Sequence, residues 1–277
     1  MLNFTACNLR NRLPEAFATA SKAYIPKANP EDQMSHRTIL AVTGPDREGF
    51  LQGLVTNDVK KARGGIIYAA MLTPQGKYLA DFFVVGEDDR ILIDVATPLS
   101  APLAQRLSMY RLRAKVEIAT VDVTVSRGLG PAPAGALPDP RDAALGWRLY
   151  GATDVSEPVD WDALRIAHLV PESGVELTPE TYILELGFER LHGVDFRKGC
   201  YVGQEVTARM KHKTELKKGL SKVRLSGPAA TGATIMAGEK EAGVLHTVAG
   251  DMGLAYLRFD RSEGEMTADG VTLSRIG

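Results

Sequence analysis

Cysteine is nearly absent from this sequence. Its 277 residues contain two cysteines, Cys7 and Cys200, and five histidines. Two distant cysteines exclude a disulfide framework and a CxxC metal-binding knuckle within the chain. The histidines form no HExxH or HxxxH pair, so the sequence predicts no dedicated metal site. Such sparse cysteine is typical of a protein from a reducing compartment.

Long apolar runs are also missing. The longest stretch without a charged residue, 225–238, has 14 residues, whereas a membrane-spanning helix needs about 20 mostly apolar residues. Residues 1–33 lack the apolar core of a secretory signal, and they suit either a weak organelle-targeting peptide or a loosely ordered extension. We therefore predict a cytoplasmic protein without a membrane anchor, or a mitochondrial matrix protein if residues 1–33 are a targeting peptide.

Neither sign of charge is in excess. The chain has 33 Lys and Arg against 34 Asp and Glu, a formal charge of −1. This balance argues against a dedicated nucleic-acid-binding body, so any basic surface must be local. One local run exists: between Arg209 and Arg224 there are seven basic residues and one acid, Glu215. It contains no aromatic residue for base stacking, and we interpret it first as a solvated face.

Helices and segregated antiparallel strands predict an α+β fold rather than a doubly wound parallel sheet. Alternation and turn residues predict strands at 38–42, 65–72, 78–86, 90–95 and 116–125, and a small β-domain or barrel from Leu220 onward. Helical periodicity predicts helices at 46–57, 97–110 and 160–169, and 181–188 fit either a helix or a strand. The Pro- and Gly-rich segment 128–140 is a predicted loop, and no GxGxxG follows a strand.

The densest candidate site is the segment KGCYVGQE, residues 198–205. Its two inner glycines allow close backbone approach on either side of Cys200. If a helix begins at Gln204, its positive end and Lys198 both favour the Cys200 thiolate, whereas Glu205 opposes it. A buried, inert cysteine in a glycine turn is the alternative. His192 lies eight residues before Cys200, but spacing cannot establish a Cys-His pair, and we interpret it as a structural or surface histidine.

KGCYVGQE followed by Ala208-Arg209 resembles the signature of the YgfZ branch of the YgfZ/GcvT superfamily. These are folate-binding proteins that support iron-sulfur cluster maintenance, and they include a mitochondrial assembly factor. The segments that also match in order are 50–59 with its TND turn, 73–82 with PQGK and an acidic strand, 110–116 and 171–177. The resemblance covers about residues 38–260.

The resemblance implies a three-part ring of antiparallel-sheet α+β domains with a C-terminal β-barrel. Tetrahydrofolate or a one-carbon derivative would bind in the ring, facing a central channel. The implied organisation is an N-terminal extension at 1–33, folate-binding α+β domains of the GcvT-like fold at 34–127 and 141–215, a Pro/Gly loop at 128–140, and a β-barrel at 216–277.

The resemblance also assigns roles to individual residues. Cys200 and Lys198 become the catalytic candidates. The implied folate-binding residues are Asp81, Asn57, Arg165, Tyr201, Gln204, Glu205 and Arg209. Aminomethyltransferases of the superfamily carry a paired acid where this chain has Ala80-Asp81, and a glutamate where it has Ala167. These departures argue against aminomethyl transfer.

The implied function is folate-dependent support of iron-sulfur cluster assembly or repair in client enzymes, including tRNA-modifying ones. Its partners would be reduced folate and iron-sulfur client proteins or assembly factors, without direct binding of nucleic acid. Two alternatives stay open: a folate-dependent aminomethyltransferase or demethylase, and a non-enzymatic adaptor that docks clients. The basic segment 209–224 could attract the carboxylates of a folate tail.

Overall fold

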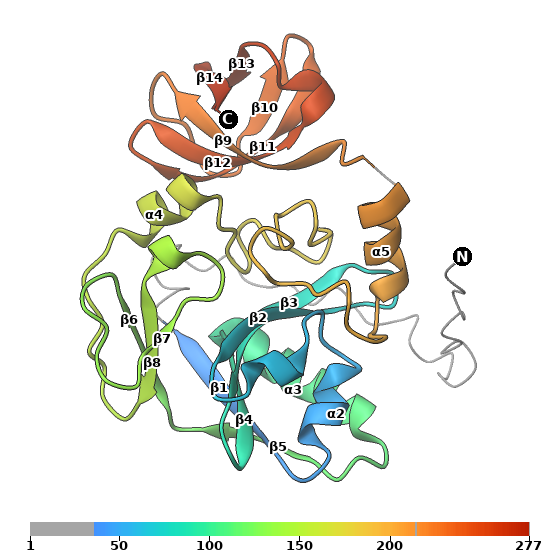
Figure 1. Ribbon diagram of the computed structural model, residues 1–277. Helices are drawn as coiled ribbons and strands as arrows, with labels where there is room; N and C mark the ends of the chain where they lie inside the picture. Colours follow the sequence, from blue (N-terminus) through green and yellow to red (C-terminus); the bar gives the residue numbers. More distant parts are fainter. Residues whose placement is uncertain (1–35, 214, 277) are drawn as a thin grey trace.

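The first half of the chain is built on a five-stranded antiparallel sheet (Figure 1). The computed structural model describes residues 36–213 and 215–276. In spatial order the strands are β2 (Ile66–Leu72), β3 (Tyr78–Gly86), β4 (Arg90–Ala96), β1 (Arg37–Thr43) and β5 (Glu117–Val121). The four predicted strands at 38–42, 65–72, 78–86 and 90–95 are therefore confirmed.

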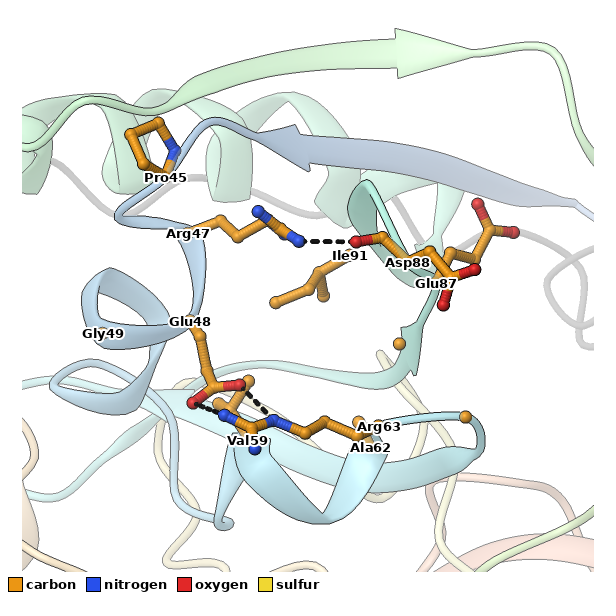
Figure 2. A pocket seen from close by; sticks show the side chains of 12 residues that line it. Pro45, Arg47, Glu48, Gly49, Val59, Ala62, Arg63, Glu87, Asp88 and Ile91 are labelled. Carbon is orange, nitrogen blue, oxygen red and sulfur yellow. Dashed lines mark hydrogen bonds and ion pairs between the residues drawn. The ribbon is translucent and has the colours of Figure 1, made fainter.

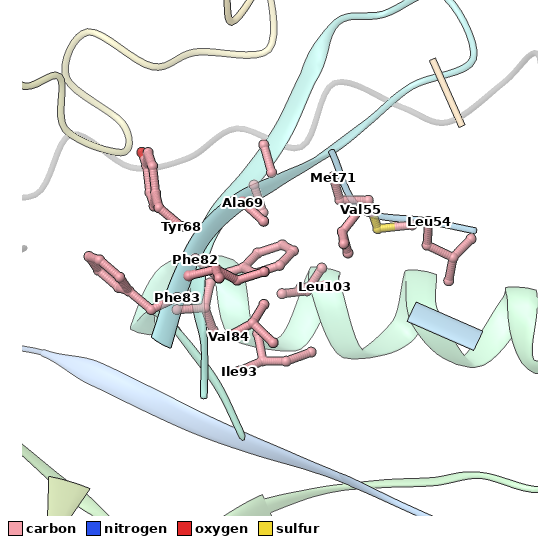
Figure 3. Packing of buried hydrophobic residues seen from close by; sticks show 14 of the residues in the cluster. Leu54, Val55, Tyr68, Ala69, Met71, Phe82, Phe83, Val84, Ile93 and Leu103 are labelled. Atoms are coloured by element: carbon pink, nitrogen blue, oxygen red, sulfur yellow. The ribbon is translucent and has the colours of Figure 1, made fainter. Parts of the chain in front are cut away.

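Helix α3 (Thr97–Arg111) covers one face of this sheet. Pro98 lies in its first turn, where the missing N–H has no helical partner to lose. Leu99, Leu103 and Leu107 recur every four residues and are buried. Figure 3 shows Leu103 among the apolar side chains of the sheet. The predicted helix at 97–110 is confirmed, and its leucine stripe builds the core of the first domain.

Helix α2 (Arg47–Gln52) is shorter than the predicted helix at 46–57. The side-chain amide of Gln52 accepts the backbone N–H of Val59 and donates to the Asp58 carboxylate, both at 2.9 Å. These side-chain bonds compete with helical ones and turn the chain into a short 3-10 helix, η3 (Val59–Ala62). The prediction was wrong for residues 53–57 because it ignored this competition.

A second sheet has three antiparallel strands, in the order β6 (Thr124–Gly128), β8 (Trp147–Gly151) and β7 (Leu137–Pro138). The predicted single strand at 116–125 is wrong, because β5 and β6 belong to different sheets. The N–H of Val123 donates to the carbonyl of Val121 at 3.1 Å, and this tight turn redirects the chain. The predicted loop at 128–140 contains β7, and a short 3-10 helix, η4 (Ala143–Leu145), precedes β8.

Two helices flank a segment of consecutive turns, residues 170–203. Helix α4 (Trp161–His168) begins where the Asp160 side chain accepts the N–H of Ala163 at 2.9 Å. Helix α5 (Gln204–Lys213) begins where the sequence predicts it. The prediction of a helix or strand at 181–188 is wrong. Those residues form successive turns closed by hydrogen bonds to carbonyls three residues earlier.

The C-terminal region is a closed six-stranded barrel, as predicted. Around the barrel the strands are β10 (Thr234–Ala237), β11 (Lys240–Ala249), β12 (Met252–Arg258), β9 (Lys218–Leu225), β14 (Val271–Ile276) and β13 (Met266–Ala268). A 3-10 helix, η5 (Phe259–Arg261), follows β12. The two sheets and the barrel surround the turns of 170–203, which places that segment at the centre (Figure 1). No helix in the described part of the chain has the length and apolar character needed to cross a membrane.

Candidate functional site

The buried side chain of Lys198 holds the KGCYVGQE segment against the end of α2. Its ammonium donates to the backbone carbonyls of Gln52 (2.8 Å), Val55 (2.5 Å) and Asn57 (2.9 Å). All three N–H donors of the ammonium are therefore used. Burial lowers the pKa of Lys198 to about 8, although the charges of Asp58 and Asp195 act against this. The structure thus shows Lys198 as an anchor of the segment, and its predicted catalytic role stays a prediction.

Gly203 seats the same segment on the β2–β3 hairpin. It has φ +85°, and a Cβ there would lie 2.6 Å from the carbonyl oxygen of Thr73. Gly76, in the hairpin turn, has φ +76°, and its Cβ would lie 2.8 Å from the Cβ of Val206. Only glycine combines this backbone conformation with such close approach. The PQGK and VGQE motifs therefore pack directly against each other.

Cys200 lies between these two attachment points and is exposed. This contradicts the alternative of a buried cysteine. The thiol is four residues before the start of α5, whose first turn carries Glu205. Arg197, three residues before Cys200, and Arg209, in α5, are also exposed. Within the described residues, no group of three or more His, Cys, Asp or Glu side chains is placed to hold a metal ion.

A chain of buried hydrogen bonds connects this segment with the centre of the molecule. The Asn57 side-chain amide donates to the backbone carbonyls of Tyr68 (2.8 Å) and His192 (2.7 Å). The Tyr68 hydroxyl donates to one oxygen of Asp81 at 2.8 Å. Because Lys198 binds the carbonyl of Asn57, an unbroken run of contacts links the Cys200 segment to Asp81.

The Asp81 carboxylate accepts three hydroxyl groups, two on Oδ1 and one on Oδ2. Besides Tyr68, it accepts the hydroxyls of Tyr78 and Ser173, both at 2.6 Å. Burial, reinforced by the Asp81 charge, raises the pKa of both tyrosines well above the usual value. Asp81 is only 7% exposed. It therefore organises the polar centre and has little capacity left for a further donor.

Next to Asp81 lies a group of polar and charged side chains that we call the Glu172 cluster: Asp162, Arg165, Glu172, Glu176 and Thr247. The Arg165 guanidinium lies 2.9 Å from Asp162, 3.1 Å from Glu176 and 3.2 Å from Glu172. Three carboxylates thus share one cation. Among the described residues, Arg165 Nε and Glu172 Oε1 are buried atoms without a hydrogen-bond partner. Burial raises the pKa of Glu172 to about 7 and outweighs the opposing charge of Arg165.

Arg127, from β6, contributes a cation to the same region. Its guanidinium carbon lies 3.9 Å from the centre of the Trp161 ring, at the start of α4. In the described part of the chain, this guanidinium has no ion pair and no hydrogen bond. Burial lowers the pKa of Arg127 to about 9, helped by nearby Arg148 and Arg141 and opposed by Glu172.

The structure separates the predicted folate-binding residues into two groups. Asn57, Asp81 and Arg165 are connected through the buried centre and the loop that carries Ser173. The others belong to the Cys200 segment and α5, where Tyr201 is buried, Gln204 is partly buried, and Glu205 and Arg209 are exposed.

Sequence reasoning missed three side chains of the centre: Arg127, Trp161 and Glu172. A signal existed for Glu172, because it stands in the matched segment 171–177 directly before Ser173. Arg127 and Trp161 belong to no motif, since their contact depends on how β6 and α4 pack.

A separate cavity of about 530 Å³ is lined in part by η3, and none of the predicted site residues lines it. Figure 2 shows that its charged side chains already pair: Arg63 binds Glu48 at 2.8 Å, and Arg47 binds the carbonyl of Asp88 at 2.8 Å. A ligand would have to displace these bonds, so this cavity is a weak candidate for the functional site.

Comparisons with known proteins identify the barrel domain and the overall fold. Residues 217–276 match the domain family described as CAF17, C-terminal beta-barrel domain. The whole fold resembles the crystal structure of glycine cleavage system aminomethyltransferase T from Bartonella henselae, with a TM-score of 0.71. That match covers 88% of this chain and 84% of the other, at 13% sequence identity. It confirms the predicted fold: antiparallel α+β sheets followed by a barrel.

Sequence relatives have a more specific name. The chain is 32% identical to the human protein named iron-sulfur cluster assembly factor IBA57, mitochondrial, over 84% of this chain and 79% of that protein. It is 31% identical to the homologue from Mycosarcoma maydis, over 73% of this chain but only 59% of that longer protein. The comparisons thus narrow the broader YgfZ resemblance, and the chain belongs to the family of IBA57 iron-sulfur cluster assembly factors.

Proposed function

We propose that this protein supports iron-sulfur cluster assembly by presenting the Cys200 thiol to a partner protein that carries or receives a cluster. The observation that carries the proposal is the exposed thiol on a segment fixed at both sides, by Lys198 and by Gly203. A side chain on a fixed turn is presented in one place with little loss of conformational entropy. The names of the human and Mycosarcoma maydis relatives support a role in iron-sulfur cluster assembly.

Cys200 would act as a thiolate ligand to iron. Thiolates are the usual protein ligands of iron-sulfur clusters, and such clusters normally take four. One thiol therefore cannot hold a cluster alone, and the partner must supply the remaining ligands. Engagement of folate-linked carbon or of sulfur by the same thiolate is an alternative chemistry at this position. Clients would be iron-sulfur enzymes or assembly factors, with tRNA-modifying enzymes among them.

A reduced folate is the cofactor that this fold suggests, and the described residues fit one. The orphaned atoms of the Glu172 cluster are a donor, Arg165 Nε, and an acceptor, Glu172 Oε1. Buried polar atoms are almost always paired, so this pair indicates a polar ligand or ordered water. A reduced pterin offers both donors and acceptors, and when bound it would supply a one-carbon group.

We also propose a mitochondrial location. The relatives are named as mitochondrial proteins, which favours the matrix over the cytoplasm among the two predicted locations. The targeting-peptide prediction concerns residues 1–33, which lie outside the described residues.

Aminomethyl transfer or demethylation is the second candidate function, and it is supported by the similarity of fold alone. Two features of the centre argue against it. The oxygens of Asp81 are occupied by three hydroxyls, and exposed Ala167 stands where the superfamily enzymes carry a glutamate. Position 167 of helix α4 therefore has no acidic side chain.

The proposal is tested by complementation. In cells that lack this protein, Cys200→Ala should fail to restore the activity of iron-sulfur enzymes, whereas wild type restores it. The variant should melt within a few degrees of wild type, because the thiol is exposed and its removal leaves no buried cavity. Enzyme activities and thermal unfolding are measured side by side.

Cys7→Ala is the matched control, since it removes the other cysteine and should complement fully. Full complementation by Cys200→Ala would contradict the thiolate role. If Asp81→Asn then abolished function in a folded protein, transfer chemistry would be favoured. If neither variant mattered, the client-docking adaptor would remain.

A further inference from the structure

We propose that Glu172 and Arg127 hold the pterin ring of the reduced folate, with Glu172 accepting its N–H groups and Arg127 donating to its ring carbonyl. The inference rests on the proposed folate binding and deepens it. Arg127 belongs to no motif, and Glu172 stands in the matched segment 171–177 but was assigned no role there, so the reason for choosing them is physical.

Glu172 is the buried acid with acceptor capacity left. It is 5% exposed, and its Oε2 lies 3.2 Å from Arg165 while its Oε1 has no partner among the described residues. Asp81, by contrast, receives three hydroxyl donors. A ligand that brings an N–H donor would therefore gain a full hydrogen bond at Glu172 and very little at Asp81.

Arg127 is the corresponding cation. The neighbouring guanidinium groups each have a carboxylate: Arg37 binds Asp94 at 2.6 Å, and Arg141 binds Asp139 at 2.8 Å. Arg127 has only the face of Trp161 in the described structure, at 3.9 Å. Its planar donors are thus available to a carbonyl or another acceptor.

The pair restricts the chemistry of the ligand. Both side chains approach helix α4, where Arg127 lies over Trp161 and Glu172 pairs with Arg165 one turn later. A simple anion would suit Arg127 but would be repelled by the Glu172 carboxylate, and a simple cation would meet the opposite difficulty. A neutral planar ring with donors and an acceptor on one edge satisfies both side chains. The 2-amino-4-oxo edge of a pterin has this arrangement, since its amino group and ring N–H stand beside a carbonyl oxygen.

The tail of the folate plays no part in this contact. Its glutamate carboxylates would have no reason to approach Glu172, so the two halves of the cofactor should behave differently. A tetrahydropterin without the tail should compete for the site, whereas p-aminobenzoylglutamate, the tail half, should not. This contrast separates recognition of the ring from attraction of the carboxylates.

The experiment is calorimetry on the full-length protein with 5-formyltetrahydrofolate, followed by competition with each half. Glu172→Gln keeps the size of the side chain but places an NH₂ donor against the ligand's donors. Arg127→Met keeps much of the contact with Trp161 and removes the guanidinium. Each variant should bind about tenfold more weakly or worse, the usual effect of losing a hydrogen bond to a charged group.

Arg258→Met is the matched control, because Arg258 is an arginine of the barrel outside the basic segment 209–224 and its side chain is 45% exposed. It should bind as wild type does. Quenching of tryptophan fluorescence that disappears in Trp161→Phe would place the ligand beside Arg127. Unchanged affinity in both Glu172→Gln and Arg127→Met, with wild-type binding intact, would overturn this inference alone. No binding to the wild type would overturn it together with the folate part of the proposed function.

Discussion

Asp94 and Glu172 are both carboxylates buried among arginines, yet their surroundings shift their pKa values in opposite directions. Burial alone raises the pKa of any carboxyl group. At Asp94 that effect is outweighed by Arg37 and Arg148, and the pKa falls to about 2. At Glu172 burial prevails, and the pKa rises to about 7. The two sites therefore differ in whether the protein supplies enough partners for the charge.

Every oxygen of Asp94 is paired. Oδ1 accepts from Arg37 at 2.6 Å, and Oδ2 accepts from Arg148 at 2.6 Å and from the Tyr150 hydroxyl at 2.8 Å. We call these four residues the Asp94 cluster. It joins strands β1 and β4 of the first sheet to β8 of the second. Its completeness suits a structural role in fixing one sheet against the other.

The Glu172 cluster is incomplete by the same measure. Its one guanidinium, Arg165, is shared among three carboxylates, and an atom of Glu172 and one of Arg165 have no partner in the described structure. It lies where α4 meets β11 of the barrel and the central turns. A group left unsatisfied at the centre of the molecule is a candidate for ligand binding, whereas a satisfied one is a candidate for stability.

The largest expected effect comes from removing the charge of the complete cluster. Asp94→Asn removes the carboxylate that Arg37 and Arg148 share, and it leaves Arg148 only the more distant Asp139, at 3.8 Å. Breaking one partner of a buried ion pair typically destabilises a protein by about 3–5 kcal/mol. We expect a loss of that order in the free energy of unfolding, measured by urea denaturation at pH 7.

An exposed acid provides the control for that experiment. Asp251 pairs with Arg224 at 3.6 Å, and its side chain is 70% exposed. Asp251→Asn should change stability by less than about 0.5 kcal/mol, as exposed pairs usually do. If Asp94→Asn behaved like this control, the Asp94 cluster would not be the structural element that its geometry indicates.

The contrast also shows how far the sequence alone predicts this protein. Strands at 38–42 and 90–95 and the helix at 97–110 follow from local periodicity, and the structure confirms them. The break between β5 and β6 does not, because a single Asp122 between β-branched residues is a weak turn signal and the turn depends on pairing with two different sheets.

The residues of the candidate site also differ in how well the sequence predicts them. Cys200 and Gly203 could be identified because they stand in one short motif, KGCYVGQE, which is recognisable in the sequence. The motif also contains Lys198, but its three carbonyl partners at 52–57 come from a distant segment. Arg127 could not be identified, and Glu172 had only its place in the matched segment 171–177 to mark it, because whether a charge has a partner is decided by tertiary packing.

The next effect concerns the pH dependence of stability. Glu172 has an ordinary pKa of 4.5 in the unfolded chain and about 7 in the folded protein. Between these values the folded state binds more protons, so stability falls as pH rises from 4.5 to 7 and then levels off. At about 1.4 kcal/mol for each pKa unit, the fall amounts to at most about 3.5 kcal/mol. Glu172→Gln should remove it, so that the variant equals or exceeds wild type in stability at pH 8.

The measurement is urea denaturation of both proteins from pH 5 to 8. Burial also lowers the pKa of His246, but His246 is present in both proteins, so its contribution is common to the two curves. A difference curve without a slope between pH 5 and 7 would show that the Glu172 carboxyl is better compensated than its orphaned oxygen suggests. In that case the claim that Glu172, unlike Asp94, lacks sufficient partners for its charge would be wrong.

The smallest expected effect concerns the contribution of the Tyr150 hydroxyl to the Asp94 cluster. Tyr150→Phe removes one donor from Oδ2 of Asp94 and one acceptor, at 3.3 Å, from Arg148 Nε, while the aromatic ring stays in place. Both guanidinium groups still face the carboxylate, so the charge remains compensated, and the loss should be near the value of a single hydrogen bond, about 1 kcal/mol. Urea denaturation of Tyr150→Phe beside Asp94→Asn gives the ratio of the two effects. If the phenol proved as important as the carboxylate, the stability of this cluster would come from its hydrogen-bond network as a whole, and the balance of charge would no longer explain why Asp94 and Glu172 differ.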